Sequence, residues 1–265
     1  MPVELSAAAR PPHPAVFLFL MLPFGVMAGY LTVTVVYLLT QAGISVEQSA
    51  ALVALSYLPH TWKFLWAPIV DTTLSRKQWY LLSAGVTAVG TYATGAVPAD
   101  ESSLPLLTAV VLISNLAVTF LAMSVESLMA HGAPDDAKGR AGGWFQAGNL
   151  GGYGVGGGVG LWLAQNMPPP WIGSAALGAT CLLCCAALAF IREPPPTPRL
   201  ERYRETLVSI LKDLWLVARS RRGFLGLLIC FLPIGTGAAS NLWSAVAGDW
   251  NATADTVALV TGVFS

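Results

Sequence analysis

Long apolar stretches recur along the chain, and they constrain its fold more than any other feature. Seven of them reach the length of about 20 residues that an α-helix needs to cross a bilayer. They cover the ranges 15–40, 46–70, 78–97, 104–130, 142–166, 171–191 and 223–247. Within hydrocarbon, backbone N–H and C=O groups must be hydrogen-bonded inside the protein, which favours helices for such runs. The sequence therefore predicts an all-α, polytopic membrane helix bundle.

The composition excludes several other classes of protein. Only 11% of the residues are charged, against about 25% in typical soluble domains. The formal net charge is zero, so no basic surface indicates nucleic acid as a partner. We find no P-loop, HExxH or GxSxG motif, and we expect neither an enzyme nor a catalytic residue. We expect no cofactor and no metal, and we interpret the cysteines in the apolar runs as reduced packing residues: Cys181, Cys184, Cys185 and Cys230.

The positions of lysine and arginine predict the orientation of the helices. Every second connection is basic, whereas the connections near 41–45, 98–103 and 167–170 contain no Lys or Arg. The basic residues outside the apolar runs are Arg10, Arg76, Lys77, Lys138, Arg140, Arg192, Arg199, Arg202, Arg204, Lys212, Arg219, Arg221 and Arg222. Since cytoplasmic loops carry an excess of positive charge, we expect a multi-pass protein of the inner (plasma) membrane with a cytoplasmic N-terminus.

The connection after the sixth run divides the chain into two unequal parts. Three prolines at 194–196 end the sixth helix, and apolar residues then recur at helical spacing: Leu200, Tyr203, Leu207, Ile210, Leu214 and Val217. This pattern predicts an amphipathic helix on the cytoplasmic membrane surface. We therefore expect a cytoplasmic tail (1–13), a six-helix half (14–192), a cytoplasmic linker (193–222) and the start of a second half (223–265). The last apolar run, over 253–265, is too short to cross hydrocarbon, so we expect a fragment or truncated product of a longer protein.

Two ionisable residues lie deep within apolar runs. Lys63 precedes Asp71 by eight residues, or about 12 Å of helix, and Glu126 lies about 9 Å before Gly132. Charges in such positions are costly and indicate a function, here a titratable pair at similar depth that faces a cavity. A snorkelling lysine and a purely structural ion pair are the alternatives.

Polar side chains in other runs recur on single helix faces. Because polar rows that face lipid are costly, we expect them to line a shared cavity with Lys63 and Glu126. The predicted substrate and proton pathway also contains His60, Tyr57, Tyr30, Tyr37, Asn115, Gln146, Asn149, Tyr153 and Asn241. A separate row of small residues predicts a helix-packing face rather than a nucleotide site: Gly148, Gly152, Gly156 and Gly160.

Two segments resemble a known family. They are YLPHTWKFLWAPIVD (57–71) and SVESLMAHGAPDDAKGRAGGWFQAGNLGG (124–152), and with the connection after the sixth run they resemble major facilitator superfamily transporters, nearest the branch of AmpG-like muropeptide permeases and acetyl-CoA transporters. The resemblance implies an incomplete major facilitator bundle, about seven and a half of twelve helices. It also implies a cytoplasmic gate at Asp71, Arg76 and Lys77. The chain departs from the family pattern at Ala67, Thr72 and Ala122.

The resemblance implies a secondary active transporter that moves substrate by alternating access. Our hypothesis is proton-coupled import of a bulky polar metabolite such as a muropeptide. A siderophore or acyl-CoA-type transporter of the same branch remains an alternative, as does a non-transporting membrane fragment or scaffold. We expect the lipid bilayer, a small-molecule substrate and protons as partners, and a monomer for the complete protein.

Overall fold

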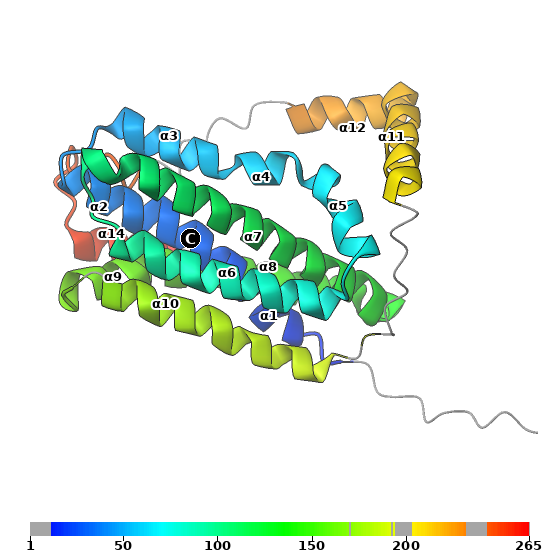
Figure 1. Cartoon of the computed structure of the whole chain (residues 1–265), viewed down its shortest axis with the longest axis horizontal. Coiled ribbons are helices and arrows are strands. Elements are labelled where there is room, and N and C mark those ends of the chain that lie inside the picture. Colours follow the sequence, from blue (N-terminus) through cyan, green and yellow to red (C-terminus); the bar gives the residue numbers. More distant parts are fainter. Residues whose placement is uncertain (1–11, 170, 192, 194–202, 232–242, 265) are drawn as a thin grey trace, which may run out of the picture.

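A computed structural model describes residues 12–169, 171–191, 193, 203–231 and 243–264. Within this part every regular element is helical, which confirms the predicted all-α class. Figure 1 shows the long helices running side by side, with α11 (Tyr203–Arg219) lying across them at one end. The elements of the first six predicted spans are α1 (Val16–Gly29), η1 (Tyr30–Val35) and α2 (Val36–Gln41); α3 (Val46–Ser56), α4 (Leu58–Thr61) and α5 (Lys63–Thr72); α6 (Arg76–Ala96); η2 (Glu101–Ser103) and α7 (Leu104–Gly132); η3 (Asp135–Ala137), α8 (Lys138–Gly154), η4 (Val155–Val159) and α9 (Gly160–Asn166); α10 (Trp171–Leu183) and η5 (Cys184–Phe190).

Three helices within the described residues are long and apolar enough to cross a membrane. They are Val16–Gln41, Glu101–Gly132 and Trp171–Phe190. The fifth predicted span is helical over Lys138–Asn166, but its many glycines lower its mean hydropathy. These three helices are the part of the membrane prediction that length and hydropathy support directly.

The second predicted span is not one helix but three short ones. A reciprocal capping box between Ser45 and Gln48 starts α3, and the helix is then interrupted at Tyr57 and again at Trp62, which has φ −95° and ψ 16°. Pro59 lies between the two interruptions and has no N–H to donate to the preceding turn. The continuous helix expected over 46–70 was therefore wrong. The break makes Lys63 the first residue of α5.

The glycine face of α8 packs directly on α1. A Cβ at Gly152 would lie 2.4 Å from the Leu22 carbonyl oxygen, and one at Gly148 would lie 2.2 Å from the Leu18 carbonyl oxygen. Glycines of α1 reciprocate, because a Cβ at Gly25 would lie 2.0 Å from the carbonyl oxygen of Asn149. Backbones this close leave no room for side chains, which is how small residues join helices in membranes.

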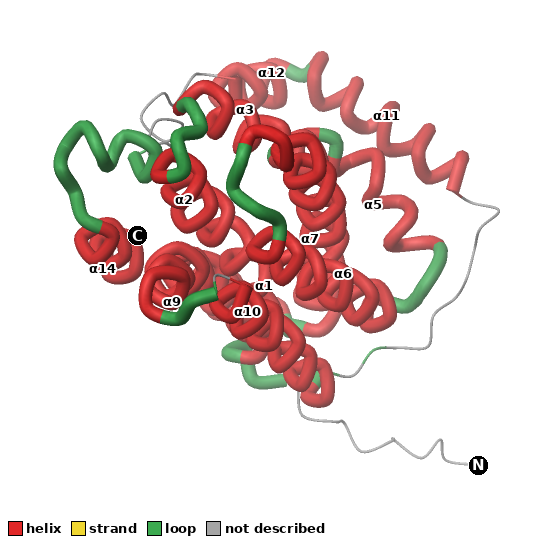
Figure 2. The backbone as a smooth tube through the Cα atoms, turned by 60° about the vertical axis from the view of Figure 1, so that its left-hand side comes forward, coloured by secondary structure: helices red, strands yellow, loops and turns green. Residues whose placement is uncertain are grey.

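Among the described residues, three further helices follow the sixth predicted span: α11 (Tyr203–Arg219), α12 (Arg221–Phe231) and α14 (Ala254–Phe264). Of the seventh predicted span, 223–247, residues 232–242 lie outside the described part. Residues 243–250 form turns, so the expected helix does not extend to Ala247. The hydroxyl of Ser244 instead donates to the Thr32 carbonyl of η1 at 2.6 Å. Figure 2 shows α14 beside α9, and a Cβ at Gly158 of η4 would lie 2.7 Å from the Ala258 carbonyl oxygen of α14.

Candidate functional site

An ion pair joins α5 to α7. The Lys63 Nζ lies 2.5 Å from Glu126 Oε1 and 2.6 Å from Glu126 Oε2, so the ammonium donates to both carboxylate oxygens. The side chains are 35% and 43% exposed, respectively. The pair is thus partly open rather than sealed in the core. An open ion pair in an apolar region can exchange a proton or a counter-ion, which a fully enclosed pair cannot do without rearrangement.

His60 lies in α4, the short helix that precedes α5 and Lys63. It also contacts α7. Its Nδ1 is 2.9 Å from the hydroxyl of Thr119, which in turn donates to the Asn115 carbonyl at 2.7 Å. The hydroxyl has one hydrogen, so a Thr119 that donates it to the Asn115 carbonyl accepts a hydrogen bond from a protonated His60 Nδ1. The Phe24 ring packs edge-on against the imidazole with centroids 5.5 Å apart.

Tyr57 and Asn115 complete this group. The rings of Tyr57 and His60 have centroids 6.1 Å apart, and Tyr57 is exposed. Asn115 is buried, and its side-chain amide donates to the Val111 carbonyl at 2.9 Å. The second predicted span and α7 therefore hold five of the predicted pathway residues in two sets of contacts: Lys63 with Glu126, and Tyr57 and His60 next to Asn115.

The polar row of α8 divides between solvent and the neighbouring helix. Gln146 is exposed, and its Oε1 lies 3.4 Å from the Asn149 amide nitrogen. The Tyr153 phenol oxygen is 2.8 Å from the hydroxyl of Thr32, so Tyr153 joins α8 to η1. Within the part of the chain that the structure describes, neither of these two hydrogen bonds reaches Lys63 or Glu126.

The tyrosines of the first span lie inside the bundle. Tyr30 is 2% exposed, and a Cβ at Gly95 of α6 would lie 2.7 Å from its phenol oxygen. Tyr37 is 6% exposed and packs in an apolar cluster with Leu161 and Ala247. Sequence reasoning expected them to face the cavity with Lys63, whereas the structure places them among neighbouring helices. Elsewhere in the first span, a glycine-rich neighbour offers backbone carbonyls to a polar side chain.

Thr34 illustrates that effect, since its hydroxyl lies 3.0 Å from the Gly156 carbonyl oxygen and 3.1 Å from that of Gly157. A Cβ at Gly160, the last glycine of the predicted packing row, would lie 3.0 Å from the same hydroxyl. Asn241, also predicted for the pathway, lies outside the described residues.

The predicted gate contains a partner that sequence reasoning missed. The Glu193 carboxylate accepts hydrogen bonds from the backbone N–H groups of Arg76 at 2.7 Å and Lys77 at 3.1 Å, at the start of α6. It also lies 3.7 Å from the Arg76 guanidinium, whose Nε donates to Ser127 of α7 at 2.7 Å. Anions at helix N-termini are favourable, so Glu193 stabilises α6 through both its charge and its hydrogen bonds. The side chain of Asp71 lies outside those that the structure describes.

In the sequence, Glu193 stood out only as a single acidic residue directly after the sixth apolar run. This position could not reveal that the partner was the backbone of residues more than a hundred positions earlier in the chain.

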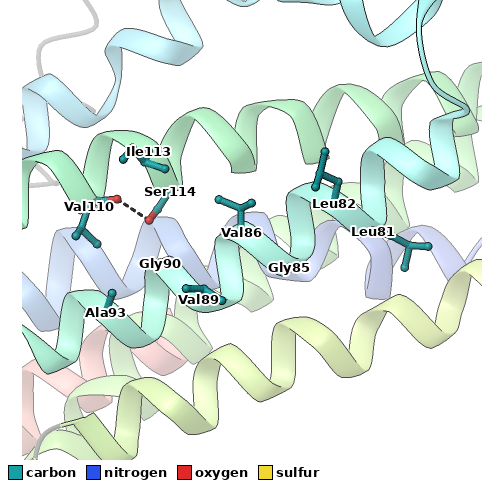
Figure 3. Close-up of a pocket in the computed structure, with 10 residues that line it drawn as sticks. All are labelled: Leu81, Leu82, Gly85, Val86, Val89, Gly90, Ala93, Val110, Ile113 and Ser114. Carbon is teal, nitrogen blue, oxygen red and sulfur yellow. Dashed lines mark hydrogen bonds between the residues drawn. The ribbon is translucent and has the colours of Figure 1, made fainter.

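A groove between α6 and α7 is separate from the polar group around Lys63. Its volume is about 500 Å³, and Figure 3 shows its lining: Leu81, Leu82, Gly85, Val86, Val89, Gly90, Ala93, Val110, Ile113 and Ser114. Ser114 carries the hydroxyl of this set, and it already donates to the Val110 carbonyl at 2.6 Å. Such a lining suits acyl chains and offers no group that would orient a polar substrate.

Comparison with known proteins adds to the picture of a helical membrane bundle. Among solved structures, the crystal structure of a D-xylose-proton symporter matches with a TM-score of 0.60 and 16% sequence identity, over 94% of this chain and 64% of that chain. The chain thus spans less than two thirds of that symporter, and at this identity the likeness shows the fold alone. No curated protein matches the sequence. The family model for the Major Facilitator Superfamily matches residues 15–265. The chain therefore belongs to the Major Facilitator Superfamily, as a multi-pass membrane protein.

Proposed function

We propose that the chain is part of a proton-coupled secondary transporter that imports a bulky polar metabolite, such as a muropeptide, by alternating access. The observation that carries this proposal is the ion pair between Lys63 and Glu126. Protonation of Glu126 would remove the counter-charge of Lys63 and change the energy of the site by a charge interaction in a partly apolar region. If binding of the substrate depends on whether Glu126 is protonated, transport of the substrate is coupled to transport of protons.

Charge balance supports a substrate with an anionic group. When Glu126 is protonated, the Lys63 ammonium needs a new counter-ion, and a carboxylate or phosphate of the substrate would supply it. Sugar–peptide fragments of the cell wall carry carboxylates, which favours the muropeptide-type substrate of the AmpG-like branch. Siderophores and acyl-CoA derivatives also bear anionic groups and remain alternatives. His60 in α4 and Tyr57 directly before α4 would contact the substrate or relay the proton, because α4 leads directly to Lys63 of the ion pair.

Residues after the linker pack against the first six spans, where we place the contact between the two halves of the transporter. Ser244 is hydrogen-bonded to η1, and α14 packs on η4 through backbone-to-backbone approach at Gly158. In transporters of this kind substrate binds between the halves near the midplane, and the halves rock around it. We place the N-terminus and the basic connections in the cytoplasm, the protein in the inner membrane, and the gate at Asp71, Arg76, Lys77 and Glu193 on the cytoplasmic side. We expect a monomer.

Transport in liposomes tests the proposal. The purified protein is reconstituted with a pH gradient, and uptake of a radiolabelled disaccharide–peptide fragment of peptidoglycan is measured together with proton movement by a pH-sensitive dye. Lys63→Met and Glu126→Gln should each abolish accumulation against a gradient while substrate exchange continues. Lys138→Met is the matched control, because Lys138 is an exposed lysine that pairs with Asp135 outside the apolar runs.

Two results would contradict different parts of the proposal. Normal accumulation by either single variant would make the pair purely structural and place the coupling site elsewhere. Proton-coupled uptake of a siderophore or an acyl-CoA, with none of the peptidoglycan fragment, would reject the muropeptide but keep the transporter. Neither substrate nor proton movement with any of the three would favour a non-transporting scaffold.

A further inference from the structure

The chain turns sharply between α11 and α12, within a region that no proposed transport step uses. Ser220 separates the two helices, and its hydroxyl accepts a hydrogen bond from the Gly223 N–H at 3.0 Å. A Cβ at Gly223 would lie 2.0 Å from the Val217 carbonyl oxygen, so this close turn requires glycine. We call residues 215–223 the elbow. Its geometry is defined by backbone contacts.

The elbow carries a concentration of positive charge. Arg219 is in the last turn of α11, Arg221 and Arg222 open α12, and all three side chains are exposed. From Tyr203 to Arg222 there are five basic residues and two acidic ones, which gives a net charge of +3. Among the described residues, none of the ion pairs involves these three arginines. Two cations at a helix N-terminus are themselves unfavourable, so the elbow is complementary to an anion.

An exposed apolar surface adjoins these charges. Val208, Leu211 and Trp215 follow one another at helical spacing along α11 and are 43%, 48% and 61% exposed. The Arg219 guanidinium lies 4.9 Å above the centre of the Trp215 ring. Tryptophan and arginine combine an apolar body with a polar or charged end, and both favour the boundary between hydrocarbon and water.

The position of the elbow places it at that boundary. Figure 1 shows α11 lying across the end of the bundle, whereas α12 runs along the direction of the long helices. Exposed apolar residues continue into α12 at Phe224, Leu225 and Leu228. The chain thus leaves a helix that lies across the end of the bundle and enters an apolar segment directly after the three arginines. That level of a membrane protein faces phospholipid headgroups.

We propose that the elbow binds the phosphate of an anionic phospholipid through Arg219, Arg221 and Arg222, while Trp215 and the apolar stripe of α11 insert at the membrane surface. Charge complementarity and continuity with the membrane-entering helix favour a lipid over a protein as the occupant. The bound lipid fixes the linker against the bilayer, and this role is independent of the substrate and of proton coupling.

Lipid retention measured by native mass spectrometry tests the proposal. The purified protein is incubated with phosphatidylglycerol or phosphatidylcholine, and the adducts that survive detergent removal are counted. Arg221→Gln/Arg222→Gln should lower phosphatidylglycerol retention by about tenfold or more, since each basic residue near an anionic surface contributes about fivefold. Lys138→Gln/Arg140→Gln is the matched control, because it removes two exposed charges from another basic connection and should leave retention unchanged. Retention by the unaltered protein should also fall as salt rises.

The same experiment can overturn the proposal. If both double variants lost phosphatidylglycerol equally, surface charge in general would explain its retention. If the unaltered protein retained the two lipids equally, the elbow would not be a site for anionic lipid and would instead suit a protein partner. Helix content by circular dichroism and elution volume establish that each variant is folded. Trp215→Ala should reduce retention while Trp215→Phe preserves most of it, which separates ring insertion from charge alone.

Discussion

The ammonium of Lys63 lies 2.5 Å and 2.6 Å from the two carboxylate oxygens of Glu126, and so joins the first residue of α5 to the C-terminal third of α7. The second span is interrupted immediately before Lys63, so α5 is not held in place by a continuous helix. Ring contact between Trp66 and Phe120, with centroids 6.2 Å apart, is a further link between α5 and α7. The pair therefore contributes to the position of α5 as well as to any proton chemistry.

Removal of one partner should destabilise the protein more than removal of both. Lys63→Met leaves the Glu126 carboxylate unpaired, and Glu126→Gln leaves the Lys63 ammonium unpaired. We expect each change to lower the free energy of unfolding by about 1–3 kcal/mol, less than for a fully buried pair because both side chains are partly exposed. Lys63→Met/Glu126→Gln should recover part of that loss. Thermal unfolding in detergent measures it, and strictly additive effects of the two changes would show that the residues do not interact.

The glycine face of α8 should be intolerant of even one methyl group. Gly152→Ala would bring Cβ to 2.4 Å from the Leu22 carbonyl oxygen, and we expect overpacking of about 3 kcal/mol or more, seen as a lower yield of folded protein and a lower melting temperature. Gly151→Ala is the control on the next residue, where a Cβ would meet no atom within 4 Å. Similar tolerance of both changes would disprove direct backbone contact between α1 and α8.

Glu193 should stabilise the start of α6. Glu193→Ala removes a carboxylate that accepts from two backbone N–H groups, and we expect a loss of about 1–2 kcal/mol in thermal unfolding. Glu193→Gln should lose less, because the amide oxygen still accepts one hydrogen bond. Glu101→Ala, an exposed acid in η2, is the control. An equal effect of the two alanine variants would remove any special role for Glu193.

Cysteine labelling tests the orientation. Ala99 and Asp136 are both exposed and lie in connections at opposite ends of α7. We expect Ala99→Cys to react with an impermeant thiol reagent in intact cells and Asp136→Cys to react only after permeabilisation, since basic connections stay in the cytoplasm. The parent protein corrects for its native cysteines. The reverse pattern would invert the topology and move the gate to the outer side.

Thr119 should act on transport through His60. Thr119→Val keeps the shape of the side chain but removes the hydroxyl that lies 2.9 Å from His60 Nδ1. If His60 relays protons, the pH profile of uptake should shift and the rate should fall by about fivefold, the effect of losing one hydrogen bond of typical strength. Thr119→Ser should retain the profile. A pH profile that Thr119→Val leaves unchanged would assign His60 a packing role.

Hydropathy, charge and spacing along the chain were sufficient for the fold class and for selecting part of the candidate site. Each helix-forming run, the depth of Lys63 and Glu126, and the small-residue face at Gly148, Gly152 and Gly156 depend on local sequence and helical periodicity. The bilayer simplifies these inferences, because it forces apolar runs into helices and makes any charge within them exceptional. Sequence reasoning thus selected two charged residues that the folded chain pairs.

Tertiary structure decided which neighbour each face meets. Thr34 belongs to a polar row like that on α7, yet it packs against the glycine-rich η4, whose exposed carbonyls at Gly156 and Gly157 accept its hydrogen bond. Glu193 finds its partners in the backbone at Arg76 and Lys77, which no periodicity encodes. Periodicity along one helix defines a face, but the identity of the partner depends on the packing of segments distant in sequence, and this is settled only when the whole bundle is assembled.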